Sequence, residues 1–293
     1  MSAGIDARMG RAHAIARTNP DEALVSRANA EAFARDGVTV LRGAFGEWVE
    51  RLREGVEKNL RSPGPHVRHY TPDGQPGRFF GDYCNWQRID EYEDFVRRSA
   101  LGAVGAALMP AAVVRFFHEH VLVKEPGTEQ PTPWHHDQPY YPVDGKLNAS
   151  LWIPLDTVPA ATCPEFIAGS HLWGKWFVPT RFTGQEWDRD SGRENVERIP
   201  DIEADRGAYD IRRYDLEPGD AIAFNFLTVH GAPPNRSASN RRRGFSARLL
   251  GDDATWAVRS GPTSPPYPEL SARLRHGDRL DDVDEFPVIY QAD

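Results

Sequence analysis

The run AVVRFFHEHVLVK, residues 112–124, begins the series of short β-rich segments that decides the fold. Glycine, proline and polar residues separate these segments, as is typical of strands joined by turns. The later runs are ASLWIPLDTV (149–158), KWFVPTRF (175–182), YDIRRYDL (209–216), AIAFNFLTVH (221–230) and RGFSARLL (243–250). Because no helices alternate with them, they predict a mainly β protein built as a jelly-roll or sandwich barrel.

The residues before this series have a helical pattern and are expected to brace the sheet. Apolar residues recur at helical spacing from Asp21 to about Arg61, interrupted by the strand-like run VTVLRGAF (38–45). A further helix is predicted over YEDFVRRSALGAVGAAL (92–108), ended by Pro110. We expect one domain over residues 1–293, divided into helical support (about 21–110), a β core (about 111–255) and a C-terminal extension (256–293).

The composition, with 40% hydrophobic and 27% charged residues, is that of an ordinary globular protein. A net charge of -8 disfavours a non-specific nucleic-acid binder, which would concentrate Lys and Arg. No run approaches the roughly 20 apolar residues that span a membrane, and the first residues lack the apolar core of a secretory signal. We therefore expect a cytoplasmic protein. Cys84 and Cys163 are too few for a disulfide framework or a thiolate metal site.

The segment TPWHHDQPYYPVDG (132–145) holds the first candidate metal ligands, His135 and Asp137. At strand spacing these two side chains project to the same side, while His136 faces away. An isolated His-x-Asp occurs by chance in many chains, but here a further histidine, His230, ends a β run. Two imidazoles and one carboxylate leave one coordination face open, which suits an Fe(II) ion that also binds a co-substrate and O₂.

Three arginines, Arg241, Arg242 and Arg243, enter the last β run. A guanidinium makes a two-pronged pair with a carboxylate, so an arginine that projects into a barrel is a candidate to bind a dicarboxylic cofactor. Arg242 is the first choice, and on a strand it shares a face with Ser246 and Arg248. The alternative interpretation is a set of solvated arginines at a strand edge.

At this point the sequence resembles the phytanoyl-CoA dioxygenase family of Fe(II)/2-oxoglutarate oxygenases. The resemblance lies in residues 36–45, 121–145, 148–158, 169–171, 217–235 and 241–250, which span most of the chain. It implies a double-stranded β-helix of the jelly-roll, cupin-like type. It also implies that His135, Asp137 and His230 bind iron, that Arg242 binds the far carboxylate of 2-oxoglutarate, and that Trp152 and Lys124 are further contacts of this cofactor.

The resemblance further implies that 2-oxoglutarate and O₂ are consumed, with succinate and CO₂ released, while a small metabolite or natural-product intermediate is oxidised. Relatives that halogenate carry a small residue where this chain has Asp137, so hydroxylation or a related oxidation is the expected reaction. The register of the arginine run leaves Arg241 as an alternative to Arg242. Ala232 stands where some members carry a hydroxyl residue that contacts the cofactor. Neither a nucleic-acid nor a membrane partner is expected, and the oligomeric state stays open.

Two other segments offer competing interpretations. His118 and His120, followed by Glu125, look like the metal motif of cupins, although the glycines around that motif are missing. They define the alternative function, a cupin-like metal-binding protein or metalloenzyme that does not use 2-oxoglutarate. Residues 85–87, in a segment rich in aromatic residues, are a candidate lid or substrate loop.

Overall fold

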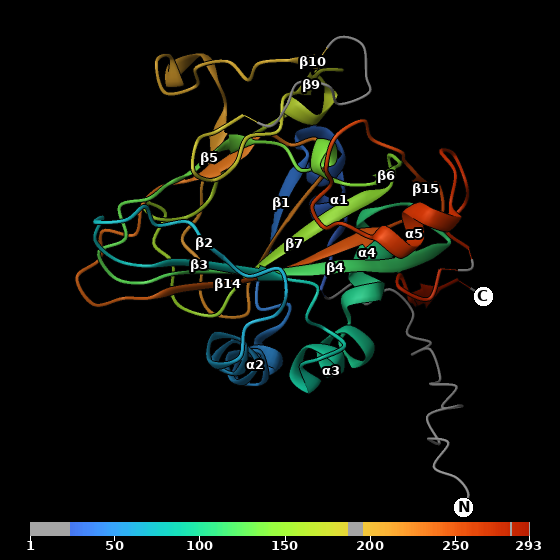
Figure 1. Ribbon diagram of the computed structural model, residues 1–293, viewed down its shortest axis with the longest axis horizontal. Coiled ribbons are helices and arrows are strands. Elements are labelled where there is room, and N and C mark those ends of the chain that lie inside the picture. The colour runs from blue at the N-terminus through green and yellow to red at the C-terminus, as the bar shows by residue number, and fades with distance from the viewer. Residues whose placement is uncertain (1–23, 187–195, 282, 293) are drawn as a thin grey trace, which may run out of the picture.

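The computed structural model describes residues 24–186, 196–281 and 283–292, and the segment assessed for a secretory signal lies outside them. Its largest element is an eight-stranded sheet (Figure 1). In spatial order the sheet comprises β1 (Val38–Leu41), β12 (Ala221–Phe224), β7 (Asn148–Pro154), β14 (Arg242–Leu250), β4 (Val113–Lys124), β3 (Phe79–Tyr83) and β2 (Arg68–His69), with β16 (Val288–Gln291) also paired to β4.

A smaller sheet faces this one and carries two of the predicted metal ligands, His135 and His230, while Asp137 lies just beyond the strand that ends at His135. Its four strands are β11 (Ile211–Arg212), β8 (Glu165–Ile167), β13 (His230–Ala232) and β5 (Thr132–His135). Two short strand pairs form separate sheets, β9 (Trp176–Phe177) with β10 (Val196–Glu197), and β6 (Val143–Asp144) with β15 (Thr255–Trp256). The two facing sheets confirm the predicted double-stranded β-helix of jelly-roll type.

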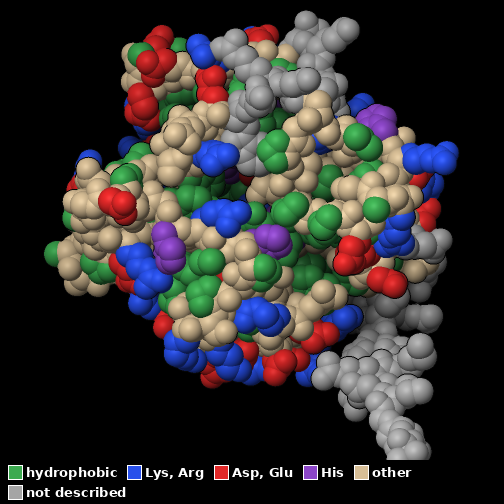
Figure 2. Space-filling view, viewed as in Figure 1, with side chains coloured by type: hydrophobic (Ala, Val, Ile, Leu, Met, Phe, Trp, Pro, Cys, Tyr) green, Lys and Arg blue, Asp and Glu red, His purple; other side chains and the backbone are tan. Residues whose placement is uncertain are grey.

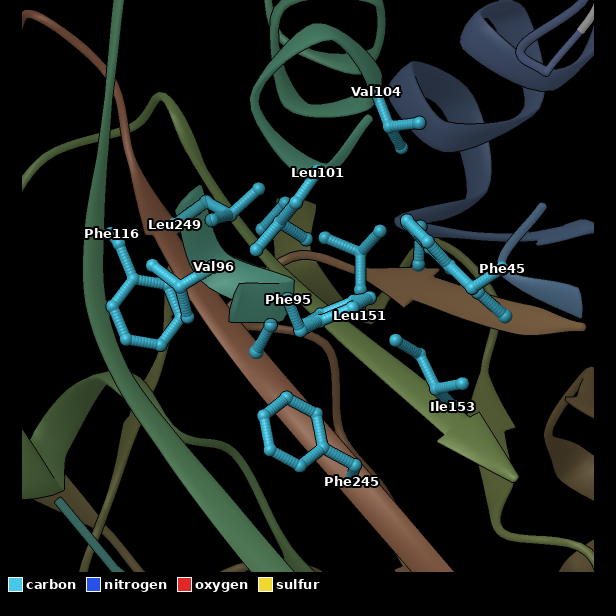
Figure 3. Close-up of a cluster of buried hydrophobic side chains, with 14 of the residues drawn as sticks. Phe45, Phe95, Val96, Leu101, Val104, Phe116, Leu151, Ile153, Phe245 and Leu249 are labelled. Carbon is cyan, nitrogen blue, oxygen red and sulfur yellow. The ribbon is translucent and has the colours of Figure 1, made fainter. Parts of the chain in front are cut away.

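Side-chain alternation gives the major sheet two different faces. On β14, Phe245, Ala247 and Leu249 are fully buried on the outer face together with Leu151 of β7. The helices α2 (Val49–Arg61) and α3 (Asp90–Arg98) lie beneath this face (Figure 1), and Phe95 of α3 meets Phe245 edge-on with ring centroids 5.4 Å apart (Figure 3). This apolar layer fixes the sheet, so the intervening residues point into the barrel.

The remaining helices flank the sheets. α1 (Arg27–Asp36) begins at a Ser26 capping box and ends at Gly37, which has a positive φ of 73° that favours glycine. α4 (Leu101–Leu108) packs against β4 and β16, and the short α5 (Pro268–Arg273) follows β15. The described residues contain no helix long and apolar enough to cross a membrane. On the face drawn in Figure 2, charges of both signs are interspersed.

The structure differs from the predicted elements at several points. The single helix predicted over 92–108 is two helices, because the chain breaks at Ser99 and Ala100 between α3 and α4. Sequence patterns also missed β3, whose five residues are all buried and therefore do not alternate. The predicted strand at 175–182 is mostly irregular, since β9 spans only two residues of it.

Candidate active site

A cavity of about 420 Å³ lies between the inner faces of the two sheets. The major sheet contributes residues of β3, β4, β7 and β14 to its wall, and the minor sheet contributes residues of β5, β8 and β13. All of the predicted site residues line it: His135, Asp137, His230, Arg242, Trp152 and Lys124. The fold therefore gathers side chains that are far apart in the sequence into one chamber.

His135, Asp137 and His230 form a compact cluster of potential metal ligands. His230 on β13 stands directly opposite His135 on β5 in the antiparallel register. The Nε2 atoms of His135 and His230 lie 3.7 and 3.9 Å from Oδ1 of Asp137. One ligand atom from each residue lies within 4.8 Å of the others, and all three side chains are buried. Among the described residues this is the one such group able to hold a metal ion.

Backbone carbonyls set the orientation of both imidazoles. Nδ1 of His135 lies 2.8 Å from the Pro133 carbonyl, and Nδ1 of His230 lies 2.9 Å from the Thr228 carbonyl. A carbonyl only accepts, so each Nδ1 donates and each Nε2 presents a lone pair to the cluster. Burial lowers the pKa of His135, and burial together with the nearby His135 lowers the pKa of His230 to about 3. Both rings are thus neutral and able to bind a cation.

The two oxygens of Asp137 have different neighbours. Oδ1 faces the histidines, whereas Oδ2 accepts a hydrogen bond from Ser150 at 3.2 Å and lies 3.6 Å from Nη2 of Arg248. Burial raises the pKa of Asp137, but the Arg248 guanidinium and the two histidines outweigh it and lower that pKa to about 2. The carboxylate is therefore ionised, with one oxygen anchored and the other directed at the two histidines.

A second cationic region lies on the same inner face. Arg242 and Lys124 are direct partners in the pairing of β14 with β4. Arg242 donates to the carbonyls of Thr162 and Pro233, and Lys124 donates to the same Pro233 carbonyl at 3.1 Å. Within the described part of the chain neither has an acidic partner. Burial lowers the pKa of Arg242 to about 10, and burial and then Arg242 lower the pKa of Lys124 well below its usual range.

The arginines on either side of Arg242 point out of the barrel. Arg241 donates to Glu125 at 2.9 Å and to Glu57 at 2.6 Å. Arg243 pairs with Asp156, with Nη2 and Oδ1 2.6 Å apart. These ion pairs on the outer side fix the register, so Arg242 is the member of the run that lines the cavity.

Trp152 forms a wall of the cavity beside the two cations. It lies on β7 opposite Ser246 of β14, next to Gly244. A Cβ atom at Gly244 would lie only 2.3 Å from Nε1 of Trp152, so glycine is needed there to admit the indole ring. Phe166 and Phe224 continue this apolar wall, and both rings contact His230.

The structure bears on the two competing interpretations of the sequence, the cupin-like metal motif and the candidate lid at residues 85–87. His118 and His120 do line the cavity, but Glu125 is engaged with Arg241, and the three form no ligand cluster among the described residues. The lid interpretation of residues 85–87 is wrong. Asn85 and Trp86 are buried in the protein, where Trp86 packs on Phe116, and none of the three lines the cavity.

Sequence reasoning missed the residues that hold Asp137. Arg248 and Ser150 are buried on the inner face, and Tyr141 accepts a hydrogen bond from Nε of Arg248 at 2.7 Å. The two-residue periodicity that places Arg242 inside also places Arg248 inside, so this signal was available. His136 behaves as expected, since it faces away and its Nε2 accepts from the Phe177 amide at 3.0 Å.

The fold and this site define a jelly-roll barrel with a His-Asp-His ligand group at its centre. The chain belongs to the phytanoyl-CoA dioxygenase (PhyH) family, whose model matches residues 33–244, and this confirms the family expected from the sequence. Family membership and the ligand group support a 2-oxoglutarate-dependent oxygenase that uses iron. No curated protein sequence matches the chain.

Solved structures similar to this chain share its fold. One is the non-haem alpha-ketoglutarate-dependent carbocyclase SnoK of nogalamycin biosynthesis, with 22% identity, a TM-score of 0.71, and 93% of this chain and 98% of that one covered. Another is the epimerase SnoN in complex with Fe³⁺, alpha-ketoglutarate and nogalamycin RO (22%, 0.69, 89% and 97%). A third is EctD from S. alaskensis with 2-oxoglutarate and 5-hydroxyectoine (17%, 0.62, 90% and 88%).

Proposed function

We propose that this protein is an Fe(II)/2-oxoglutarate-dependent dioxygenase that hydroxylates, or otherwise oxidises, an unactivated carbon of a small molecule. The observation that carries the proposal is the combination of two features in one cavity. One is the cluster of His135, Asp137 and His230, and the other is the pair of buried cations, Arg242 and Lys124, which have no anionic partner among the described residues. A metal-binding protein that does not use 2-oxoglutarate would need only the ligand cluster.

The chemistry of the donor set fits iron. Two neutral imidazole nitrogens and one carboxylate oxygen converge, while the remaining coordination positions would face the cavity. This set leaves room for a chelating co-substrate and O₂. We assign the metal to His135, Asp137 and His230, with the two backbone carbonyls holding the rings in the binding tautomer.

The buried cations fit a dicarboxylic acid. Burial without a counter-charge lowers the pKa of both Arg242 and Lys124, and an anion placed between them would relieve that cost. We therefore assign the far carboxylate of 2-oxoglutarate to Arg242 and Lys124, with Trp152 as the adjoining wall. Bound together, iron and 2-oxoglutarate supply the oxidising chemistry, in which 2-oxoglutarate and O₂ are consumed and succinate and CO₂ are released.

Asp137 favours oxygenation over halogenation. Its carboxylate would fill a coordination position that a halide would otherwise occupy, and Ser150 and Arg248 hold the carboxylate in place. The similar structures include a carbocyclase and an epimerase, so hydroxylation is the first expectation within a wider group of oxidations. The cavity volume of about 420 Å³, shared with 2-oxoglutarate, supports a small metabolite or natural-product intermediate as substrate.

The test is an anaerobic titration of the purified apoprotein with Fe(II) and 2-oxoglutarate. The expected result is the weak visible charge-transfer band of the chelated keto acid, followed by succinate release when O₂ is admitted. The Asp137→Ala variant should lose both, whereas Asp144→Ala, which removes a carboxylate paired with Arg259 outside the cluster, should keep both. Iron binding without the band would overturn the 2-oxoglutarate assignment and favour a cupin-like metalloprotein.

A further inference from the structure

Beyond the cofactor region, the inner face of the major sheet carries a second polar row. Four residues at alternate positions of β4 line the cavity: His118, His120, Leu122 and Lys124. In the register, Lys124 pairs with Arg242, His120 pairs with Ser246 and His118 pairs with Arg248. Along a strand that rises about 3.3 Å per residue, His118 lies roughly 20 Å from Lys124. The histidines thus lie beyond the paired cations along β4, beside Arg248, which contacts Asp137 of the ligand cluster.

Each of these histidines has a buried ring nitrogen without a hydrogen-bond partner. Nδ1 of His118 and Nε2 of His120 are both shielded from solvent, and the described residues offer neither atom a donor or acceptor. Buried polar groups in folded proteins are almost always paired, because an unpaired group loses the hydrogen bonds it made to water. Both residues line the cavity near the metal ligands, so a turn of either imidazole ring would present its unpaired nitrogen to a group bound there, which would supply the missing partner.

The charges of the surrounding side chains restrict what kind of group can bind at this wall. Burial, and after it the positive charge of Arg248, lowers the pKa of His118 well below its usual range and that of His120 to about 3. Each ring is therefore a neutral imidazole, with one nitrogen that donates and one that accepts. A hydroxyl group both donates and accepts, so it satisfies either tautomer, whereas an ammonium group would be repelled by Arg248.

Aromatic side chains form the rest of this chamber. Phe182 stacks against His120 with ring centroids 6.4 Å apart and lies 5.3 Å from the ring of His135. The ring of Tyr83, opposite His120 on β3, meets it edge-on at 5.4 Å, and Tyr70 packs on Phe182 at 4.9 Å. Flat apolar walls with a few polar atoms are suited to a ring that carries a polar substituent.

We propose that His118 and His120 are substrate-positioning residues that hydrogen-bond a neutral hydroxyl group on a ring-containing substrate. The inference rests on the proposed function, because it takes the metal to lie at the neighbouring ligand cluster and the far carboxylate of 2-oxoglutarate to lie at Arg242 and Lys124. It assigns a substrate class, hydroxylated cyclic compounds, that the ligand group and the family do not specify. His118 and His120 hold the substrate while the metal site acts on a carbon nearby.

The test measures binding directly with three fluorinated probes of matched shape: 4-fluorophenol, fluorobenzene and 4-fluorobenzoate. Fluorine NMR titrations are run on the protein loaded with 2-oxoglutarate and with Zn²⁺, a diamagnetic substitute for iron. We expect 4-fluorophenol to bind about three- to tenfold more tightly than fluorobenzene, as one or two neutral hydrogen bonds would give. Equal affinity would overturn the proposal, and tighter binding of 4-fluorobenzoate would replace the hydroxyl by an anion.

Variants of the two histidines distinguish hydrogen bonding by the ring nitrogens from the effect of the shape of the cavity wall. His120→Phe and His118→Phe should each remove the preference for 4-fluorophenol over fluorobenzene. His120→Gln and His118→Asn carry an amide near the unpaired nitrogen, and these variants should restore the preference in part. His171 is the matched control, since its Nδ1 is also buried and unpartnered but does not line the cavity. His171→Gln should leave the preference unchanged, and a loss of preference there would count against the proposal.

Failure of the proposed function can be distinguished from failure of this inference. Calorimetric titration of 2-oxoglutarate into the Zn²⁺-loaded protein reports on the cofactor end alone. If 2-oxoglutarate does not bind, the proposed function fails whatever the probes do. If 2-oxoglutarate binds and 4-fluorophenol shows no preference that depends on His118 or His120, only the substrate-positioning assignment fails.

Discussion

Arg242 and Lys124 face each other across β14 and β4, and both donate to the single carbonyl of Pro233. Two cations are thereby held side by side in the barrel interior, with backbone oxygens but no carboxylate of the described chain beside them. Such an arrangement is unfavourable until an anion binds, because buried charges without a counter-charge lose their hydration. The pair therefore has the properties of an anion site prepared in advance of its ligand.

The first prediction concerns the affinity for 2-oxoglutarate. Arg242→Gln should raise its Kd about 10- to 100-fold, since a hydrogen bond to a charged group contributes roughly 1.5–3 kcal/mol. Arg241→Gln is the matched control, because that side chain pairs with Glu57 and Glu125 outside the cavity. Isothermal titration calorimetry measures the Kd of both variants for 2-oxoglutarate. Similar losses in the two variants would mean that the arginine run acts on the fold and not on the ligand.

A second prediction concerns the anchoring of Asp137. Ser150→Ala removes the hydrogen bond to Oδ2, which leaves the carboxylate free to rotate away from the metal position. Loss of such supporting contacts typically costs 10- to 100-fold in metal affinity, so we expect about a tenfold weaker Fe(II) affinity under anaerobic conditions. Ser246→Ala, a buried serine on the same inner face without a hydrogen bond to Asp137, should stay within about twofold. Equal effects would show that Ser150 does not position the ligand.

The core of the outer face offers a prediction about stability. Phe245 is fully buried between β14 and the helices α2 and α3, where it contacts Tyr92 and Phe95. Phe245→Ala should lower the free energy of unfolding by about 3–5 kcal/mol, as large-to-small changes in cores do. Leu172→Ala, at a side chain that is 68% exposed, should change it by less than about 0.5 kcal/mol. Urea denaturation gives both values, and comparable losses would contradict the assignment of Phe245 to the core.

The parts of this protein that could be predicted from sequence are those fixed by local periodicity. Alternation along residues 112–124 and 243–250 gave the strands and, with them, the inward positions of Arg242 and Lys124. Strand spacing also predicted that His135 and Asp137 share a side, but β5 ends at His135 and Asp137 has helical backbone angles before a 3₁₀ turn, so this turn brings the two side chains together. The position of His230 at the end of a β run made it the candidate third ligand, and the family resemblance implied the same role.

Other features depend on contacts between distant segments, which periodicity does not report. Arg242 and not Arg241 lines the cavity, because Glu57 of α2 and Glu125 after β4 pair with Arg241 on the outer side. The anchoring of Asp137 by Arg248 likewise joins two separate strands. β3 was missed because a strand buried on both faces has no alternation to detect.

The last prediction concerns pH and the buried Glu119, which lies on the outer face of β4. Its carboxyl accepts hydrogen bonds from the amides of Asn85 (2.5 Å) and Trp86 (3.3 Å). Burial raises the pKa of Glu119 to about 8, against an ordinary value of 4.5. Between these two values the folded state keeps a proton that the unfolded state has lost, so stability should fall as the pH rises through this range.

Glu119→Gln removes this titration while it keeps an oxygen that can accept from the two amides. The free energy of unfolding of the wild type, measured relative to Glu119→Gln by urea denaturation, should therefore decrease from pH 6 to pH 8.5. Glu47→Gln, at an exposed position, should follow the wild-type dependence on pH. A stability difference that stays constant over this range would mean that Glu119 is already ionised in the folded protein at pH 6, held by the amides of Asn85 and Trp86 more strongly than burial disfavours its charge.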